Sequence, residues 1–220
     1  RSRERFTFDE GCSEAVKEVF VTLYNKGLIY KGAYIVNWCP RCQSAISDIE
    51  TEYETEQGHM WEISYPLVGE PGAIIVDTTR PETMFGDVAI AVHPSDKKYS
   101  ELIGKNVLVP LTNRIIPIIA DEYVDKSFGT GAVKITPAHD PNDFEVGKRH
   151  NFKPIWVIDE EGKLKACGEV PQEYHGLDRY EARKKIVDML QFKGFLLRVK
   201  DHEHNVGKCQ RCNTTIEPLL

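Results

Sequence analysis

Two cysteine pairs near opposite ends of this 220-residue chain constrain its fold most strongly. Cys39 and Cys42 form one Cys-x-x-Cys pair, and Cys209 and Cys212 form the other. Each pair places two thiolates on a tight turn, which supplies half of a tetrahedral zinc site. The start of the sequence shows no secretory signal pattern, so metal binding is expected before disulfide formation. We expect one structural zinc ion per chain, held by all four thiolates. The alternative is four reduced cysteines without a metal.

Composition limits the class of protein. The formal net charge is −6, which argues against a dedicated nucleic-acid binder because phosphate contacts depend on Lys and Arg. No apolar run approaches the roughly 20 residues that a membrane helix needs. The length suits one core plus a smaller module. We expect a cytoplasmic piece of a larger protein, without a membrane partner.

The hydrophobic pattern favours short strands with a few helices. A helix is expected after a capping box at 7–10 and ends at Gly27. A second helix is expected from Asp178 to Gly194, and a short one at 143–150. Strands are expected at 73–76, 88–92, 107–111, 132–136 and 155–158. Residues 115–119 surround Pro117 and are expected at a sheet edge.

Two turns carry unusually dense polar chemistry. Residues 77–87 read Asp-Thr-Thr-Arg-Pro-Glu-Thr-Met-Phe-Gly-Asp, and residues 129–143 read Gly-Thr-Gly-Ala-Val-Lys-Ile-Thr-Pro-Ala-His-Asp-Pro-Asn-Asp. A turn needs only one Gly, Pro or Asn for its geometry, so the other polar residues are expected to form the walls of a pocket. The alternative for the first turn is a structural role, in which Arg80 pairs locally with Glu82 or Asp87.

The order and spelling of the two turns resemble the editing domain of valyl-tRNA synthetases, which belong to the class I aminoacyl-tRNA synthetases. The isoleucyl pattern instead has a histidine at the position of Lys134, followed by His-Gly-Pro-Asp-Asp. The leucyl pattern reads His-Asp-Gln-Arg-Asp where this chain has His-Asp-Pro-Asn-Asp at 139–143. An isoleucyl-type domain is the nearest alternative.

The resemblance also implies an architecture. It predicts a mainly β fold with peripheral helices, built as a β-barrel, plus a small zinc-knuckle module. Residues 1–34 would form a helical stalk segment. Residues 35–54 and 202–220 would form the zinc knuckles and connecting strands, and residues 55–201 the editing barrel.

The resemblance implies roles for the residues of the two turns. Asp143 would bind the α-ammonium group of an aminoacyl substrate. Lys134 and Asp140 would read a hydroxyl on the substrate side chain. The remaining predicted pocket residues are Thr78, Thr79, Arg80, Thr83, Phe128 and His139. Phe128 would line the pocket and stack on the terminal base, whereas His139 would either orient a water or cap the turn.

The implied activity is hydrolysis of a mischarged threonyl-tRNA(Val) ester. The partners would be the 3′ end of that tRNA and the rest of the parent synthetase, which would hold the ATP-binding site. The sequence shows no Ser-His-Asp or Cys-His nucleophile pattern and no aminoacylation motif, so no covalent intermediate and no valine activation are expected. Two alternatives remain, namely an RNA-binding module without catalysis and a folded fragment that is inactive alone.

Overall fold

The computed structural model describes residues 4–220, which divide into two units, residues 4–34 and 35–220. The first unit holds helix α1 (Glu10–Asn25). The N-cap is Asp9, whose side chain accepts a hydrogen bond from the Cys12 backbone, so the expected cap at Thr7 is wrong. Gly27 follows the helix with a φ of +70°, as the sequence predicts. None of the α1 residues is buried, so its apolar face is exposed.

The second unit is mainly β, with its strands in three sheets. The first sheet has the order β10 (Glu217–Leu219), β1 (Val36–Cys39) and β2 (Ser44–Ile46). The second has the order β4 (Ala73–Thr78), β3 (Thr51–Pro66) and β9 (Leu196–Cys209). The third has the order β6 (Asn106–Leu108), β7 (Ile115–Ala120), β5 (Ala89–Val92) and β8 (Ala132–Ile135). Strand pairing within residues 35–220 closes no barrel, so the expected barrel is replaced by separate sheets.

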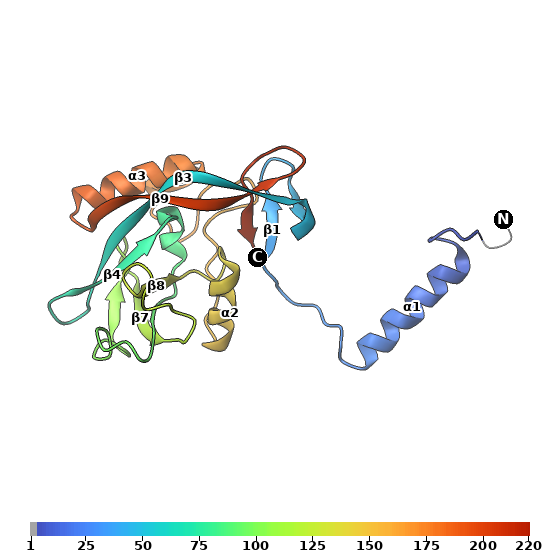
Figure 1. Cartoon of the computed structure of the whole chain (residues 1–220), viewed down its shortest axis with the longest axis horizontal. Coiled ribbons are helices and arrows are strands. Elements are labelled where there is room, and N and C mark those ends of the chain that lie inside the picture. The colour runs from blue at the N-terminus through green and yellow to red at the C-terminus, as the bar shows by residue number, and fades with distance from the viewer. Residues whose placement is uncertain (1–3) are drawn as a thin grey trace. The chain divides into compact units, whose positions relative to one another are not determined.

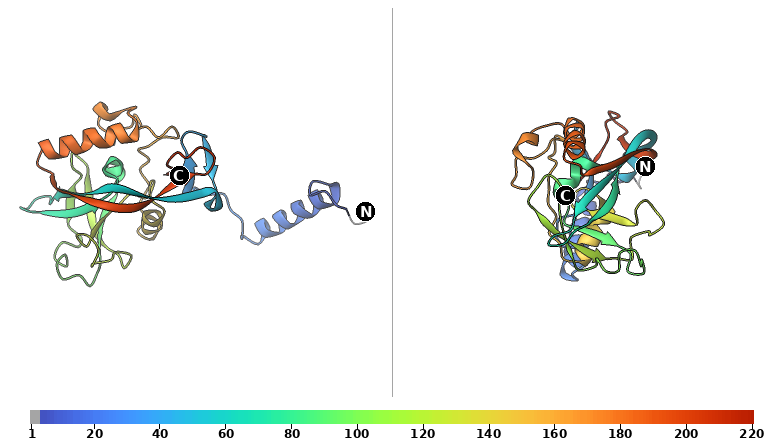
Figure 2. Two further views of the ribbon diagram at one scale, coloured as in Figure 1. Left: turned by 45° about the horizontal axis from the view of Figure 1, so that its top comes forward. Right: turned by 90° about the vertical axis from the view of Figure 1, so that its left-hand side faces the viewer.

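Helices cover parts of these sheets. The α-helices are α2 (Pro141–Arg149) and α3 (Arg179–Phe192), and the 3₁₀ helices span Asp48–Glu50, Pro81–Gly86 and Gln172–Tyr174. Figure 2 shows α3 lying along the sheet that contains β3 and β9. No helix within the described residues is long and apolar enough to cross a membrane.

The longest strands are β3 and β9, which pair antiparallel along a ribbon (Figure 1). Thr51 lies opposite Cys209 at one end, and Ile63 lies opposite Leu196 at the other. The ribbon therefore connects the cysteine pairs to the main core. Connecting strands were expected only at 35–54 and 202–220, which overlap the cysteine end of the ribbon. The hydrophobic pattern does not predict the full strands, because most residues of the ribbon's first half are exposed and polar and give no apolar alternation.

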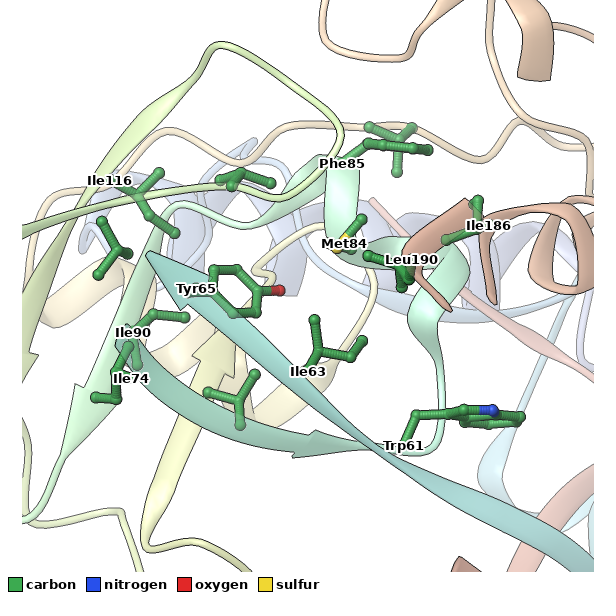
Figure 3. Close-up of a cluster of buried hydrophobic side chains, with 14 of the residues drawn as sticks. Trp61, Ile63, Tyr65, Ile74, Met84, Phe85, Ile90, Ile116, Ile186 and Leu190 are labelled. Carbon is green, nitrogen blue, oxygen red and sulfur yellow. The ribbon is translucent and has the colours of Figure 1, made fainter. Parts of the chain in front are cut away.

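The main core lies between the ribbon, the buried 3₁₀ helix Pro81–Gly86 and α3 (Figure 3). Ile63 and Tyr65 come from β3, Phe85 from the 3₁₀ helix, and Ile186 and Leu190 from α3. All five side chains are fully buried, and burial of each aliphatic side chain contributes about 1.5–3 kcal/mol. This packing fixes the backbone of the first polar turn, because that turn contains the 3₁₀ helix.

Two predicted strands are corrected by the structure. β7 lies inside its sheet, between β6 and β5, rather than at an edge. Pro117 is tolerated there because the pairing with β5 begins only at Ile118, so that ladder loses no donor. Residues 155–158 form only a single bridge, between Ile158 and Leu164. Their apolar character reflects burial of a loop rather than strand pairing.

Candidate functional site

The two polar turns meet around a cavity of about 410 Å³ in the second unit, a size typical of small-ligand sites. The first turn follows β4, while the second runs through β8 into the start of α2. All nine residues predicted for the pocket line this cavity: Thr78, Thr79, Arg80, Thr83, Phe128, Lys134, His139, Asp140 and Asp143. The structure therefore brings together two segments that are about fifty residues apart in the sequence.

Glycine shapes the entrance to the second turn. Gly129 has a φ of +57°, a conformation that residues with a Cβ rarely adopt. A Cβ at Gly129 would also lie 2.8 Å from the Asp77 Oδ2 atom. The Gly-Thr-Gly spelling therefore allows the turn to approach the end of β4 and to place Phe128 at the cavity.

Asp143 is a buried carboxyl group on the first turn of α2. Its Oδ2 atom accepts a hydrogen bond of 2.8 Å from the Thr136 backbone N–H. Burial raises the pKa of Asp143 to about 8, and repulsion from Asp140 adds to the increase, whereas Lys134 opposes it. A cation that entered the cavity would offset the cost of charging this group.

Lys134 is buried, and its ammonium group is surrounded by protein oxygens. The Nζ atom lies 2.9 Å from Thr83 Oγ1, 2.5 Å from Thr136 Oγ1 and 3.1 Å from Asp87 Oδ1. Tyr65 donates to the other Asp87 oxygen at 2.7 Å. An ammonium has three protons, so contact with a substrate hydroxyl would require Lys134 to exchange one of these partners. Its observed contacts hold the two turns together.

Arg80 is held by acids from two parts of the chain. Its guanidinium donates to Glu82 Oε1 at 3.2 Å and to Glu217 Oε1 at 2.5 Å. Glu217, on β10, also accepts from Arg179 at 2.7 Å. Burial alone would raise the pKa of Glu217, but Arg80, His139 and Arg179 hold it well below its usual range. The local pairing with Glu82 is present, whereas the contact with Glu217 has no signal in the sequence.

His139 lies behind the cavity in a neutral, structural arrangement. Its Nε2 atom accepts a 3.0 Å hydrogen bond from the Val157 backbone N–H. Its Nδ1 atom lies 3.6 Å from Glu217 Oε1. Burial lowers the pKa of His139, so the ring is uncharged at neutral pH. The ring therefore holds the loop at Val157 rather than its own turn, and the two expected roles of His139 stay predictions.

The other predicted residues hold the backbone or face the cavity mouth. Asp140 is the N-cap of α2 and accepts hydrogen bonds from the backbones of residues 142 and 143. Thr78 accepts from the Arg80 backbone N–H at 3.0 Å. Phe128 is 59% exposed, and its ring lies edge-on to His202 with centroids 6.5 Å apart. The exposed ring is therefore available to a ligand at the mouth.

Three further lining residues, Asp77, Val133 and Thr136, belong to the two predicted turns but had no expected role. Sequence reasoning missed five others as pocket residues: Met60, Tyr123, His202, His204 and Asn205. His202 and His204 are two positions apart on β9 and share a face, with stacked rings 5.8 Å apart. That spacing would have been informative had the strand been recognised. Asp77 has a buried carboxyl with no hydrogen bond, 3.8 Å from Lys200.

The cysteine pairs meet at the other end of the ribbon. The sulfurs of Cys39, Cys42, Cys209 and Cys212 all lie within 4.8 Å of one another. Sulfurs of a tetrahedral zinc site with bonds of about 2.3 Å lie about 3.8 Å apart, so the cluster fits a four-thiolate metal site. Pairing of β1 with β2 and of β3 with β9 positions the two turns.

Comparisons with known proteins agree with the resemblance of the two turns to class I aminoacyl-tRNA synthetases. A sequence model of class I tRNA synthetases (I, L, M and V) matches residues 1–204. A protein named valine–tRNA ligase from Carboxydothermus hydrogenoformans is 61% identical over 99% of this chain and 24% of its own length. Proteins of the same name from Geobacter sulfurreducens and Thermotoga maritima are 57% and 53% identical, over 24% and 25% of their lengths. The chain thus spans about a quarter of the length of these relatives.

Proposed function

Because this chain belongs to the class I tRNA synthetases, we propose that it is the proofreading region of a valine–tRNA ligase and hydrolyses threonyl-tRNA(Val). The observation that carries the proposal is the buried Asp143 carboxyl in a polar cavity. An aminoacyl ester bears an α-ammonium, for which a fixed carboxylate is the natural partner.

The pKa of Asp143 supports this pairing. With a pKa of about 8, the Asp143 carboxyl is protonated at neutral pH before substrate binds. An incoming α-amine has an unperturbed pKa near 8, so the carboxyl and the amine together need one proton. Transfer of that proton to the amine gives an ammonium–carboxylate pair. The pair fixes the acyl group in one orientation in the cavity.

Hydrolysis follows by attack of water on the ester carbonyl. The new carbon–oxygen bond forms from water, and the ribose oxygen leaves with a proton, which yields free threonine and uncharged tRNA. Among residues 4–220, the cavity lining contains no serine or cysteine, so we expect no covalent intermediate and a protein contribution of positioning and electrostatic stabilisation. The ribose hydroxyl next to the ester is suitably placed to assist proton transfer.

Selectivity follows from the polar lining. A hydrophobic pocket rejects an isostere with one added hydroxyl poorly, and valine against threonine is a known example of this limit. The site proposed here would instead require the hydroxyl. Asp140 and the hydroxyls of Thr83 and Thr136 offer partners for it, with Lys134 fixing the two threonines. A valine methyl would form no hydrogen bond with these groups, so valine would bind without that contribution.

We propose that Cys39, Cys42, Cys209 and Cys212 hold one structural zinc ion, since their sulfurs are close enough for a closed tetrahedral site. The metal would tie the ends of the β3–β9 ribbon. The rest of the parent enzyme would supply tRNA affinity and the ATP-dependent reaction, which would take place in the cytoplasm.

A second candidate, an RNA-binding module without catalysis, is less well supported because the chain has a net charge of −6. A deacylation assay with threonyl-tRNA(Val) separates the two. We expect Asp143→Ala to slow hydrolysis at least tenfold, because the ammonium loses a charge-assisted hydrogen bond worth about 1.5–3 kcal/mol.

Glu145→Ala is the matched control, because Glu145 lies on the same helix and pairs with exposed Lys148. This variant should hydrolyse at the wild-type rate. The assay is run on this chain and on the full-length ligase, so that an inactive fragment is distinguished from an inactive site. Wild-type rates for Asp143→Ala in the full-length ligase would contradict the proposed anchor.

A further inference from the structure

A second cavity of about 430 Å³ adjoins the first in the same unit. It lies between α3 and the β3–β9 sheet, and Thr79 and His204 line both cavities. These two residues therefore form the boundary between the cavities. A ligand that continues out of the first cavity past this boundary would meet the second.

Aromatic rings and a guanidinium form one wall of the second cavity. The Tyr180 ring is 47% exposed. The Arg183 guanidinium carbon lies 5.4 Å from the Tyr180 ring centroid and 5.8 Å from that of Trp61. Flat aromatic and guanidinium surfaces of this kind bind nucleobases by stacking without reading their sequence.

This wall is held rigidly against the first cavity. Arg183 donates two hydrogen bonds to Glu82, at 2.8 and 2.7 Å. Glu82 is fully buried, belongs to the first polar turn and also accepts from Arg80. One buried carboxylate therefore connects the walls of the two cavities and fixes the spacing between their ligands.

The charges around the second cavity suit a phosphodiester. Arg183 and Lys184 line it from α3 with one acid, Asp188, and His59 and His204 add ring nitrogens from the strands. Arg183 is already paired with the buried Glu82, so Lys184 is the cation that would meet a phosphodiester. Lys184 is exposed, and an exposed lysine binds phosphate as a mobile point charge.

We propose that the second cavity binds the nucleotide that precedes the terminal adenosine of the tRNA. This inference rests on the proposed function, in which the first cavity holds the aminoacylated terminal nucleotide. The preceding base stacks on Tyr180, the linking phosphodiester crosses the boundary at Thr79 and His204, and Lys184 contributes a cation. The site should accept any of the four bases, because each base offers a flat ring face that can stack on Tyr180.

The test compares two non-hydrolysable ligands by calorimetry on this chain. One is adenosine with threonine joined to its 3′ position by an amide, and the other is the same compound extended at its 5′ side by cytidylate. We expect the extension to tighten binding about fivefold or more in the wild type. Tyr180→Ala and Lys184→Ala should each reduce this gain and leave the affinity for the shorter ligand unchanged.

Two matched variants serve as controls. Tyr180→Phe keeps the ring, and Lys185→Ala removes a neighbouring exposed lysine that lines a different cavity; both should retain the full gain. The proposal is overturned if the extension changes wild-type affinity less than twofold, or if the gain survives in both test variants.

If the shorter ligand does not bind, the proposed function fails, and an NMR titration with the unacylated dinucleotide still decides the second cavity. A shift of the Trp61 indole signal that adenosine monophosphate does not produce supports the site. An unshifted signal overturns it.

Discussion

Replacement of Asp143 by asparagine should make the chain more stable at alkaline pH than the wild type. The carboxyl of Asp143 is buried and accepts the Thr136 backbone N–H. Its pKa rises from an ordinary value of 3.8 to about 8, chiefly through burial. Asparagine has the shape of the protonated acid and keeps the acceptor oxygen, so the substitution removes the titration with little change in packing.

The sign and size of this stability difference follow from the difference in proton binding between the folded and unfolded states. Between pH 4 and 8 the folded state holds a proton that the unfolded state has lost. The stabilisation from the protonated Asp143 carboxyl is therefore fully present below about pH 4 and is lost as the pH rises through about 8. Each pH unit in that window changes the free energy of unfolding by about 1.4 kcal/mol. From pH 5 to pH 8 the wild type should lose up to about 4 kcal/mol relative to Asp143→Asn.

Urea unfolding of both proteins at pH 5, 6, 7 and 8, with zinc at a constant concentration, measures this difference. Groups that titrate equally in the two proteins cancel, which isolates Asp143. A difference in unfolding free energy that stays constant within about 1 kcal/mol over this range would refute the raised pKa. The proton-sharing account of ammonium binding would fail with it.

Two further results are expected. Lys134→Met should lower the free energy of unfolding by about 3–5 kcal/mol, because it leaves the Asp87 carboxylate buried without its cation; adding Asp87→Asn should recover part of that loss in urea unfolding. Cys209→Ser should reduce bound zinc well below one ion per chain by elemental analysis, while Cys167→Ser, outside the cysteine cluster, should leave it unchanged; a stable wild type without metal would contradict the zinc proposal.

Local sequence was sufficient for features whose cause is local. Asp178 caps α3 through the Tyr180 N–H, as its position before an apolar helical pattern predicts. The two polar turns were recognisable because they hold more charges and hydroxyls than the backbone geometry of a turn needs. The meeting of the cysteine pairs was predicted because two half-sites make one closed metal site.

The tertiary structure decided which partner each polar group has. Nothing near Arg80 in the sequence indicates Glu217, which lies 137 residues away, and Lys134 is enclosed by oxygens from the other turn. The first half of β3 and the part of β9 paired with it were missed because their residues are mostly exposed and polar and leave no hydrophobic period. The second half of β3 does carry a signal, since Trp61, Ile63 and Tyr65 alternate along the strand and are buried. The amino-acid sequence determines which types of polar group the site contains. Long-range strand pairing determines which of these groups form hydrogen bonds within the protein and which can bind a ligand.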